Sequence, residues 1–336
     1  MFGRLRSFFA ELHRDLKASA EQARLNADRL NHISYQVDLL TRENRVLMAS
    51  LALPPMELWR GRLETQEAGP AQHVFPHSAL CRQDSFEQPC FPYWMRKLGL
   101  PIAYHRKLWE YAYICQALSE RGAIRRGARG LGFGVGREPL AALFAAADCE
   151  VVGTDMAPEA ALEQGWSTSD QHAAGLNALR HPQVCPPEQF DRRVSFEVCD
   201  MNAIPEHLCG FDFCWSSCAF EHLGSIEQGL KFVENSLQCL KPGGWAVHTT
   251  EFNLSSNDHT LNSGVTVIFR QRDMEELRKR VTAQGHAIAP FDFDPGFGAI
   301  DRYVDVPPYR SEPVLKFVLE GYATTSIGLI VRRGEG

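Results

Sequence analysis

The sequence predicts an α/β fold in which a mainly parallel sheet carries helices on both faces and follows a long N-terminal helix. From Gly127 onward, short apolar runs alternate with amphipathic stretches, which is the pattern of an open sheet built from strand–helix–strand units. Before that region, residues 5–52 contain neither proline nor glycine and are rich in good helix formers.

Length and composition limit the number of domains and the kinds of partner that we expect. A chain of 336 residues with 44% hydrophobic residues is long enough for one large domain and additional segments. We expect an oligomerisation helix over 1–53, a covering segment over 54–126 and the α/β domain over 127–333. The net charge of −6 offers no basic surface for nucleic-acid phosphates, so no nucleic-acid partner is expected.

The N-terminal helix has the heptad pattern of a coiled coil, kept up over about six heptads. Asn44 falls at a core position, where it can fix register and strand number. A long helix folded back on its own domain is the alternative, and self-association is preferred. The core positions are Phe9, Leu16, Ala23, Leu30, Val37, Asn44 and Leu51, with Leu12, Ser19, Asn26, Ile33, Leu40 and Leu47 between them.

We expect neither a membrane-spanning helix nor a signal peptide from this sequence. No apolar run is long enough to cross a membrane, and the N-terminus lacks the profile of a signal peptide. The basic and apolar residues of the first turns are read as the start of the coiled coil and not as a stable membrane contact. We therefore expect a cytoplasmic homo-oligomer associated through residues 9–51.

The covering segment begins where Pro54 and Pro55 end the helix. Residues 56–103 are too aromatic for a flexible linker. Residues 104–121 then predict a helix with Leu108, Cys115 and Leu118 on one face.

Seven strands and three helices are expected in the α/β domain, with a late strand running antiparallel. The strands are 127–131, 150–153, 194–198, 211–215, 245–250, 286–290 and 326–331, and the helices are 139–147, 224–240 and 272–284.

A glycine-rich turn follows the first of these strands. Gly132, Gly134 and Gly136 alternate along it, and glycines let a ligand approach the backbone closely. A dinucleotide fingerprint needs G-x-G-x-x-G, but Arg137 stands where its third glycine belongs. The turn therefore speaks against a nicotinamide-dependent oxidoreductase.

Further features follow this turn in order. The next strand ends in Asp155, where a carboxylate can accept both hydroxyls of a ribose. A third strand ends before Asp200 and Met201, whose carboxylate and backbone N–H can bind an adenine. The tight turn Leu240-Lys241-Pro242-Gly243-Gly244 leads into the fifth strand. Together these features, over residues 127–253, resemble the class I S-adenosylmethionine-dependent methyltransferases.

The resemblance implies a Rossmann-like fold, S-adenosylmethionine as cofactor and a set of cofactor contacts. Gly130 departs from the family, which often has an acidic residue at this position to hold the methionyl amino group; Glu138 is the candidate to take its place. The implied cofactor residues are Gly132, Phe133, Gly134, Gly136, Asp155, Met156, Asp200, Met201 and Trp215.

Catalytic groups are expected at the carboxyl ends of the fourth and fifth strands, where ligands of parallel sheets bind. His222 is the first choice for general base, since an imidazole pKa of about 6.5 suits proton removal near neutral pH. Glu221 precedes it, and His248 and Glu251 end the fifth strand.

A metal site is the alternative use of these side chains. Cys218, Glu221 and His222 partly resemble the E-x-x-E-H motif of small-RNA 2′-O-methyltransferases, with Cys218 in place of the first glutamate. A hydrogen-bonding wall without metal is preferred.

The acceptor is expected to be a small molecule or glycan, because 105–333 resembles bacterial methyltransferases that modify sugars. Polar groups alternate with aromatic ones at 105–109 and 301–309. The predicted function is O-methylation of a sugar, glycan or other small hydroxyl compound. An inactive coiled-coil scaffold and an RNA methyltransferase are the alternatives.

Overall fold

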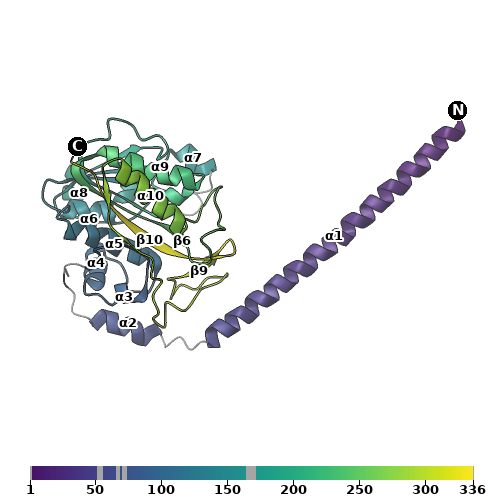
Figure 1. The fold of residues 1–336 in the computed structure, drawn as a ribbon, viewed down its shortest axis with the longest axis horizontal. Helices are drawn as coiled ribbons and strands as arrows, with labels where there is room; N and C mark the ends of the chain where they lie inside the picture. The colour runs from purple at the N-terminus through teal and green to yellow at the C-terminus, as the bar shows by residue number, and fades with distance from the viewer. Residues whose placement is uncertain (1, 51–55, 66–68, 70–73, 164–171, 336) are drawn as a thin grey trace. The chain divides into compact units, whose positions relative to one another are not determined.

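The computed structural model describes residues 2–50, 56–65, 69, 74–163 and 172–335, in two compact units that comprise residues 1–52 and 53–336 (Figure 1). The first unit is the helix α1, Phe2–Ser50, of 49 residues. Its heptad residues Leu16, Leu30, Ile33 and Leu40 are between 55% and 67% exposed. The predicted long helix is confirmed, and its pairing into a coiled coil stays a prediction. No helix in the described part of the chain is long and apolar enough to cross a membrane.

The second unit is built on one sheet with the strand order β4-β3-β2-β5-β6-β10-β7, and β9 is added to β10. Neighbouring strands from β4 to β6 are parallel, and β10 runs antiparallel to β6. The predicted Rossmann-like fold is confirmed, including the late antiparallel strand. The strands are β2 Arg129–Phe133, β3 Glu150–Asp155, β4 Val194–Val198, β5 Phe211–Ser217, β6 Leu240–Asn253, β7 Ala287–Ile288, β9 Phe317–Leu319 and β10 Tyr322–Arg332.

The strand order reverses between β2 and β5, and this reversal positions the site. From β2 the chain moves outward to β3 and β4, and it then returns to β5 on the other side of β2. Because the crossover helices leave the two halves in opposite directions, a crevice opens at the carboxyl ends of these strands.

The three predicted helices of the α/β part lie near their predicted positions, and α7 and α8 are two further helices that were not predicted. The region predicted as one helix over 224–240 is α9 followed by a short 3₁₀ turn, and α9 begins where Ser225 accepts a hydrogen bond from the backbone N–H of Gln228. The elements are α6 Leu140–Ala146, α7 Pro158–Glu163, α8 Pro187–Arg193, α9 Ile226–Ser236 and α10 Gln271–Ala283, with 3₁₀ turns at Leu176–Leu179, Phe220–His222 and Leu237–Cys239.

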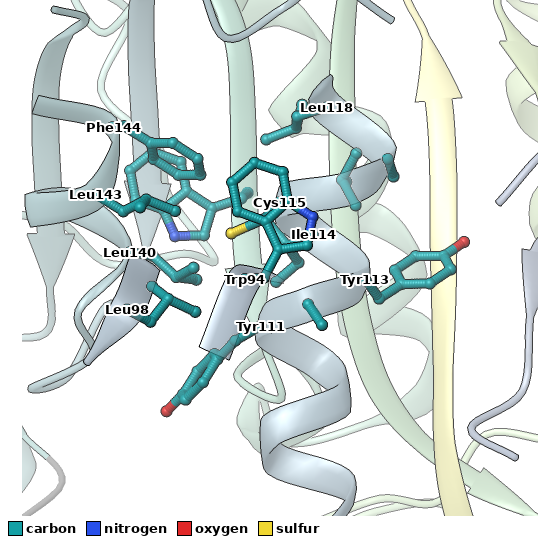
Figure 2. Close-up of a cluster of buried hydrophobic side chains, with 14 of the residues drawn as sticks. Trp94, Leu98, Tyr111, Tyr113, Ile114, Cys115, Leu118, Leu140, Leu143 and Phe144 are labelled. Carbon is teal, nitrogen blue, oxygen red and sulfur yellow. The ribbon is translucent and has the colours of Figure 1, made fainter. Parts of the chain in front are cut away.

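Residues 56–126 contribute more regular structure than expected. Besides the predicted helix, which is α5 (Arg106–Glu120), they form α2 Met56–Thr65, α3 Gln83–Phe86 and α4 Cys90–Leu98, and the short strand β1 (Ser78–Ala79) pairs with β8 (Phe291–Asp292). Helix α5 is buried from Trp109 to Leu118. Figure 2 shows Trp94 and Leu98 of α4 and Leu140 and Phe144 of α6 gathered around Cys115. This packing fixes α5, whose first turn reaches the carboxyl edge of the sheet.

Candidate functional site

A cavity of about 880 Å³ opens at the carboxyl ends of the parallel strands. The glycine turn after β2 and the ends of β3 and β4 line one side, and the first turn of α5, the segment after β5, the end of β6 and β9 line the other. The lining residues used below are His105, Arg106, Lys107, Gly134, Gly136, Glu138, Asp155, Met156, Asp200, Met201, Ser217, Cys218, Glu221, His222, Glu251, Phe317 and Leu319.

The glycine turn forms a floor that only glycine can provide. Gly134 and Gly136 have φ angles of +56° and +51°, in the left-handed region that favours glycine. A Cβ atom on Gly134 would lie 2.8 Å from the Cβ of Ala219, closer than two carbon atoms can approach. The turn therefore keeps the backbone bare where a ligand passes over it.

Asp155 ends β3 with its carboxylate facing this turn. Its Oδ2 accepts hydrogen bonds from the backbone N–H groups of Gly136 and Ala173 at 3.0 and 3.1 Å, and its Oδ1 accepts one from Met156 at 2.8 Å. Burial raises the pKa of this carboxyl by more than these three hydrogen bonds lower it. A carboxylate has about four acceptor positions, so one stays available for a ligand hydroxyl such as that of a ribose.

Asp200 and Met201 follow β4 and also line the cavity. The Oδ1 of Asp200 accepts a hydrogen bond from the backbone N–H of Asn202 at 2.8 Å, which holds the loop in a turn. Together with Met156, these residues bring the predicted adenosine contacts to one side of the cavity. This arrangement fits an adenosyl group above the bare glycine turn.

Three of the predicted cofactor residues lie beneath the cavity and not in its lining. Gly132, Phe133 and Trp215 are not among the residues that line the cavity. A Cβ on Gly132 would meet the ring of Trp215 at 2.4 Å, so this glycine accommodates Trp215. Phe133 packs edge-on against Phe232 in the core. These residues shape the sheet beneath the cavity.

The other side of the cavity is a buried network of charges around Glu110, which is 0% exposed. Arg106 and Lys107 contact its two carboxylate oxygens at 3.2 Å each. Burial would raise the pKa of Glu110, but Lys107 and Arg106 outweigh it and lower the pKa to about 2. Ser217 and Ser326 donate further hydrogen bonds to it. Glu110 is therefore the ionised centre that orients both cations.

Two more carboxylates lie on this side of the cavity, and together with Arg106, Lys107 and Glu110 they form its charged wall. Glu251, at the end of β6, accepts from the Nη2 of Arg106 at 2.5 Å, and Glu221 accepts from the hydroxyl of Thr250 at 2.9 Å. Both side chains are buried, and this burial raises the pKa of each. Proton acceptors of near-neutral pKa thus meet at the cavity wall.

His222 ends the 3₁₀ turn after β5 and lies beside Glu221. Its Nδ1 is 2.9 Å from the carbonyl oxygen of Val265, and a carbonyl can only accept, so Nδ1 carries the proton and Nε2 the lone pair. Burial lowers the pKa of the ring. His222 is therefore neutral at pH 7, and its Nε2 is able to take up a proton.

His248, which was predicted to be catalytic, belongs to the core. It is 0% exposed and is not among the residues that line the cavity. Its ring nitrogens contact the hydroxyls of Ser216 and Ser236 at 2.8 and 3.2 Å, and burial lowers its pKa to about 3. Successive side chains of a strand point to opposite faces. His248 faces α9, whereas Glu251 faces α5.

The three side chains whose ligand atoms could hold a metal ion include Glu251 in place of the His222 expected from the sequence. Ligand atoms of Cys218, Glu221 and Glu251 lie within 4.8 Å of one another. However, Arg106 already bonds Glu251, and its Nη1 lies 3.7 Å from the Sγ of Cys218. The guanidinium thus already supplies a positive charge among these three side chains.

Only some of the charged residues that line this side of the cavity are predicted by the sequence. His105, Arg106 and Lys107 line the cavity as expected, but Trp109 is buried in the core, stacked on Tyr113. The 301–309 loop contributes no lining residue among those described. Glu110 was overlooked, although its spacing of four from Arg106 is the signal of a helical ion pair.

Comparison with known proteins agrees with this geometry. Residues 130–248 match the family model described as "Methyltransferase domain". No curated protein matches the chain. The chain is similar in structure to magnesium protoporphyrin IX methyltransferase from Synechocystis, with 12% identity, a TM-score of 0.41, and 68% of this chain and 83% of that chain covered. It is also similar to phosphoethanolamine N-methyltransferase 2 from Haemonchus contortus, with 17% identity, a TM-score of 0.42, and 66% and 52% covered.

At such identities the likeness to solved structures is loose, and the assignment rests on the family model. The turn, the carboxylate after β3 and the strand order are those expected from the sequence. Residues 130–248 thus form a class I methyltransferase domain, and the protein is an enzyme with S-adenosylmethionine as its methyl donor.

Proposed function

We propose that this enzyme methylates a hydroxyl oxygen of a small polar acceptor, such as a sugar or glycan, with His222 as the general base. One observation carries the proposal: Glu221, His222 and Glu251 line the same cavity as the glycine turn and Asp155. When bound, S-adenosylmethionine supplies an electrophilic methyl group on a positively charged sulfur. The chain must then orient the acceptor and remove its proton.

In this proposal, the proton of the acceptor hydroxyl moves to His222. As the acceptor oxygen forms its bond to the methyl carbon, the sulfur–methyl bond breaks and its electron pair stays on sulfur. The hydroxyl proton passes to Nε2 of His222, whose Nδ1–H is held by Val265. The imidazolium that forms lies 3.9 Å from Glu221, and a preorganised carboxylate stabilises such a developing charge.

The charges of the wall favour a neutral acceptor. Four carboxylates, those of Glu110, Glu138, Glu221 and Glu251, accompany two cations, Arg106 and Lys107. A phosphate or carboxylate in this wall would face an excess of like charge. Sugar hydroxyls can donate to the carboxylates, while Phe317 and Leu319 offer apolar surface to the C–H faces. These features support a neutral polyhydroxyl compound.

The test is a turnover assay of the full chain with S-adenosylmethionine, neutral sugars and oligosaccharides, and the matching sugar phosphates. We expect a gain of one methyl on an oxygen of a neutral sugar, located by NMR. His222→Gln should lower turnover by about 100-fold or more, with affinity for S-adenosylhomocysteine within about twofold. His207→Gln is the matched control, because His207 is exposed and pairs with Glu197 outside the cavity.

Other results would decide against the proposal. Methylation of a nitrogen, or of sugar phosphates in preference to sugars, would remove the hydroxyl acceptor or its neutrality. Binding of the cofactor without turnover of any acceptor would favour the scaffold alternative. Normal turnover by His222→Gln would remove the base.

We also propose that the enzyme associates through α1. In the described part of this helix, the exposed residues Leu30, Ile33 and Leu40 follow the heptad spacing, and a second copy of the same helix offers the matching stripe. A helix of 49 residues supplies more than the three to four heptads needed for a stable coiled coil. This association is independent of the chemistry proposed above.

A further inference from the structure

Glu138 presents an unpaired carboxylate oxygen at the edge of the glycine turn. Its side chain is 10% exposed, and it lines the cavity beside Gly134 and Gly136. The Oε1 contacts the ammonium of Lys107 at 2.9 Å. The Oε2 is buried and has no hydrogen-bond partner among the described residues. Leaving such an atom unpaired is costly, so this position calls for a donor from outside the chain.

Lys107 has no N–H to spare for this oxygen. Besides Glu138, its ammonium reaches the carbonyl oxygen and the hydroxyl of Ser217 at 3.0 and 2.9 Å, and Glu110 at 3.2 Å. An ammonium has three donors, so these contacts occupy it fully. Lys107 thus fixes the direction of Glu138 and balances part of its charge, while Oε2 keeps its acceptor capacity for a ligand.

Among the described residues that line the cavity, Glu138 and Glu251 each have a buried carboxylate oxygen without a hydrogen-bond partner, and Glu251 lies at the end of β6 and not beside the turn. The carboxylate of Asp155 accepts three backbone N–H groups, and its one remaining acceptor position is the one expected for a ribose hydroxyl. Gly130 offers no side chain, and a Cβ there would meet the ring of Phe213 at 2.4 Å, so β2 has no room for an acidic group at this point. A cationic group that lies over the glycine turn therefore meets Glu138.

We propose that Glu138 accepts the ammonium group of the methionyl part of the cofactor, with Lys107 as its positioning residue. The inference rests on S-adenosylmethionine as the methyl donor and assigns one subsite of it to one oxygen atom. The chemistry matches, because the methionyl end carries an α-ammonium group and a buried carboxylate is its strongest hydrogen-bonding partner. Burial raises the pKa of Glu138 to about 7, and an ammonium ligand would keep the carboxyl ionised.

Calorimetry with three ligands tests this subsite without turnover. S-adenosylhomocysteine carries the ammonium, its deaminated analogue lacks only that group, and 5′-methylthioadenosine lacks the whole amino-acid end. Glu138→Gln should weaken S-adenosylhomocysteine roughly tenfold to hundredfold. The other two ligands should stay within about twofold of the unmodified enzyme. Glu150→Gln, on an exposed residue at the start of β3, is the matched control and should change none of them.

The outcomes separate the two assignments. Unchanged affinity of Glu138→Gln for S-adenosylhomocysteine, or an equal loss for all three ligands, overturns the subsite and leaves the methyl donor in place. Failure of the unmodified enzyme to bind any of the three overturns both. Should the glutamine variant unfold, Glu138→Asp withdraws the carboxylate by one methylene, and a selective loss for the ammonium-bearing ligand is again the expected result.

Discussion

The guanidinium of Arg106 bonds the carboxylate of Glu251 at 2.5 Å and joins the first turn of α5 to the end of β6. The same guanidinium contacts Glu110 and lies over the ring of Phe317 at 4.6 Å. Burial would lower the pKa of Arg106, but Glu251 and Glu110 raise it, so this residue is a permanent cation. A helix that precedes the methyltransferase domain in the chain therefore completes the charged wall of that domain's cavity.

Replacing Arg106 with methionine should destabilise the protein by about 3–5 kcal/mol, because the partners of a buried ion pair are left uncompensated. Urea unfolding at pH 7 measures the loss. Arg272→Met is the control, since Arg272 pairs with Asp258 at the surface, and such pairs contribute about 1 kcal/mol or less. Equal losses in both variants would show that the Arg106 pair is no more important than a surface one.

The strands and the side of the cavity with the glycine turn followed from the sequence because their signals are local. Alternating glycines, a carboxylate after a strand and short apolar runs each indicate one element, and parallel strands place their ends at one edge. Gly134, Gly136, Asp155 and Asp200 accordingly meet in one cavity.

The charged wall of the cavity was only partly predictable, because it depends on contacts between distant segments. Whether a side chain of β6 lies in the core or in the cavity depends on which face of this strand meets α5. A shift of one residue along the strand exchanges the two faces. His248 consequently lies in the core and Glu251 in the cavity. Likewise, Trp215 fills the space above Gly132, a packing relationship that neither residue indicates alone.

Asp155→Ala should remove ribose binding and also loosen the glycine turn. We expect the affinity for both S-adenosylhomocysteine and 5′-methylthioadenosine to fall by about 100-fold, since hydrogen bonds to a charged group contribute about 1.5–3 kcal/mol each. Because Asp155 accepts three backbone N–H groups, stability should fall as well, by about 1–3 kcal/mol. Calorimetry and urea unfolding measure the two effects. Retained affinity for methylthioadenosine would remove Asp155 from the ribose.

The ligand-free protein should lose stability as the pH rises from about 5 to about 8. Burial raises the pKa of Glu138 from 4.5 to about 7, so the folded protein binds this proton more tightly than the unfolded chain. Its contribution is present below pH 4.5 and is lost as the pH passes about 7. Lys107, Glu110 and Tyr111 also face this carboxyl, and Glu110 titrates below the window because its pKa is lowered to about 2.

Thermal and urea unfolding of Glu138→Gln between pH 5 and 8 isolate this contribution. Between pH 5 and 8, the free energy of unfolding of the variant should fall by up to about 3 kcal/mol less than that of the unmodified protein. Saturating S-adenosylhomocysteine should flatten the profile of the unmodified enzyme, because the bound ammonium keeps the carboxyl ionised. An identical slope with and without Glu138 would mean that this group does not titrate in the window.

Aspartate at a heptad position of α1 should dissociate the oligomer, whereas aspartate beside it should not. Leu40 is a core position of the predicted heptads and is 64% exposed, and its neighbour Leu39 is 43% exposed but lies outside the core positions. In a coiled coil, Leu40→Asp buries a charge at the seam, while Leu39→Asp faces solvent. Light scattering should therefore give the mass of one chain, 37.8 kDa, for Leu40→Asp. A chain lacking residues 1–52 should give the smaller mass of one shortened chain. Leu39→Asp should keep the mass of the unmodified protein. The same number of chains per particle in all four proteins would contradict association through α1. Dissociation by both aspartates alike would contradict the heptad register, which places Leu40 at the seam and Leu39 outside it.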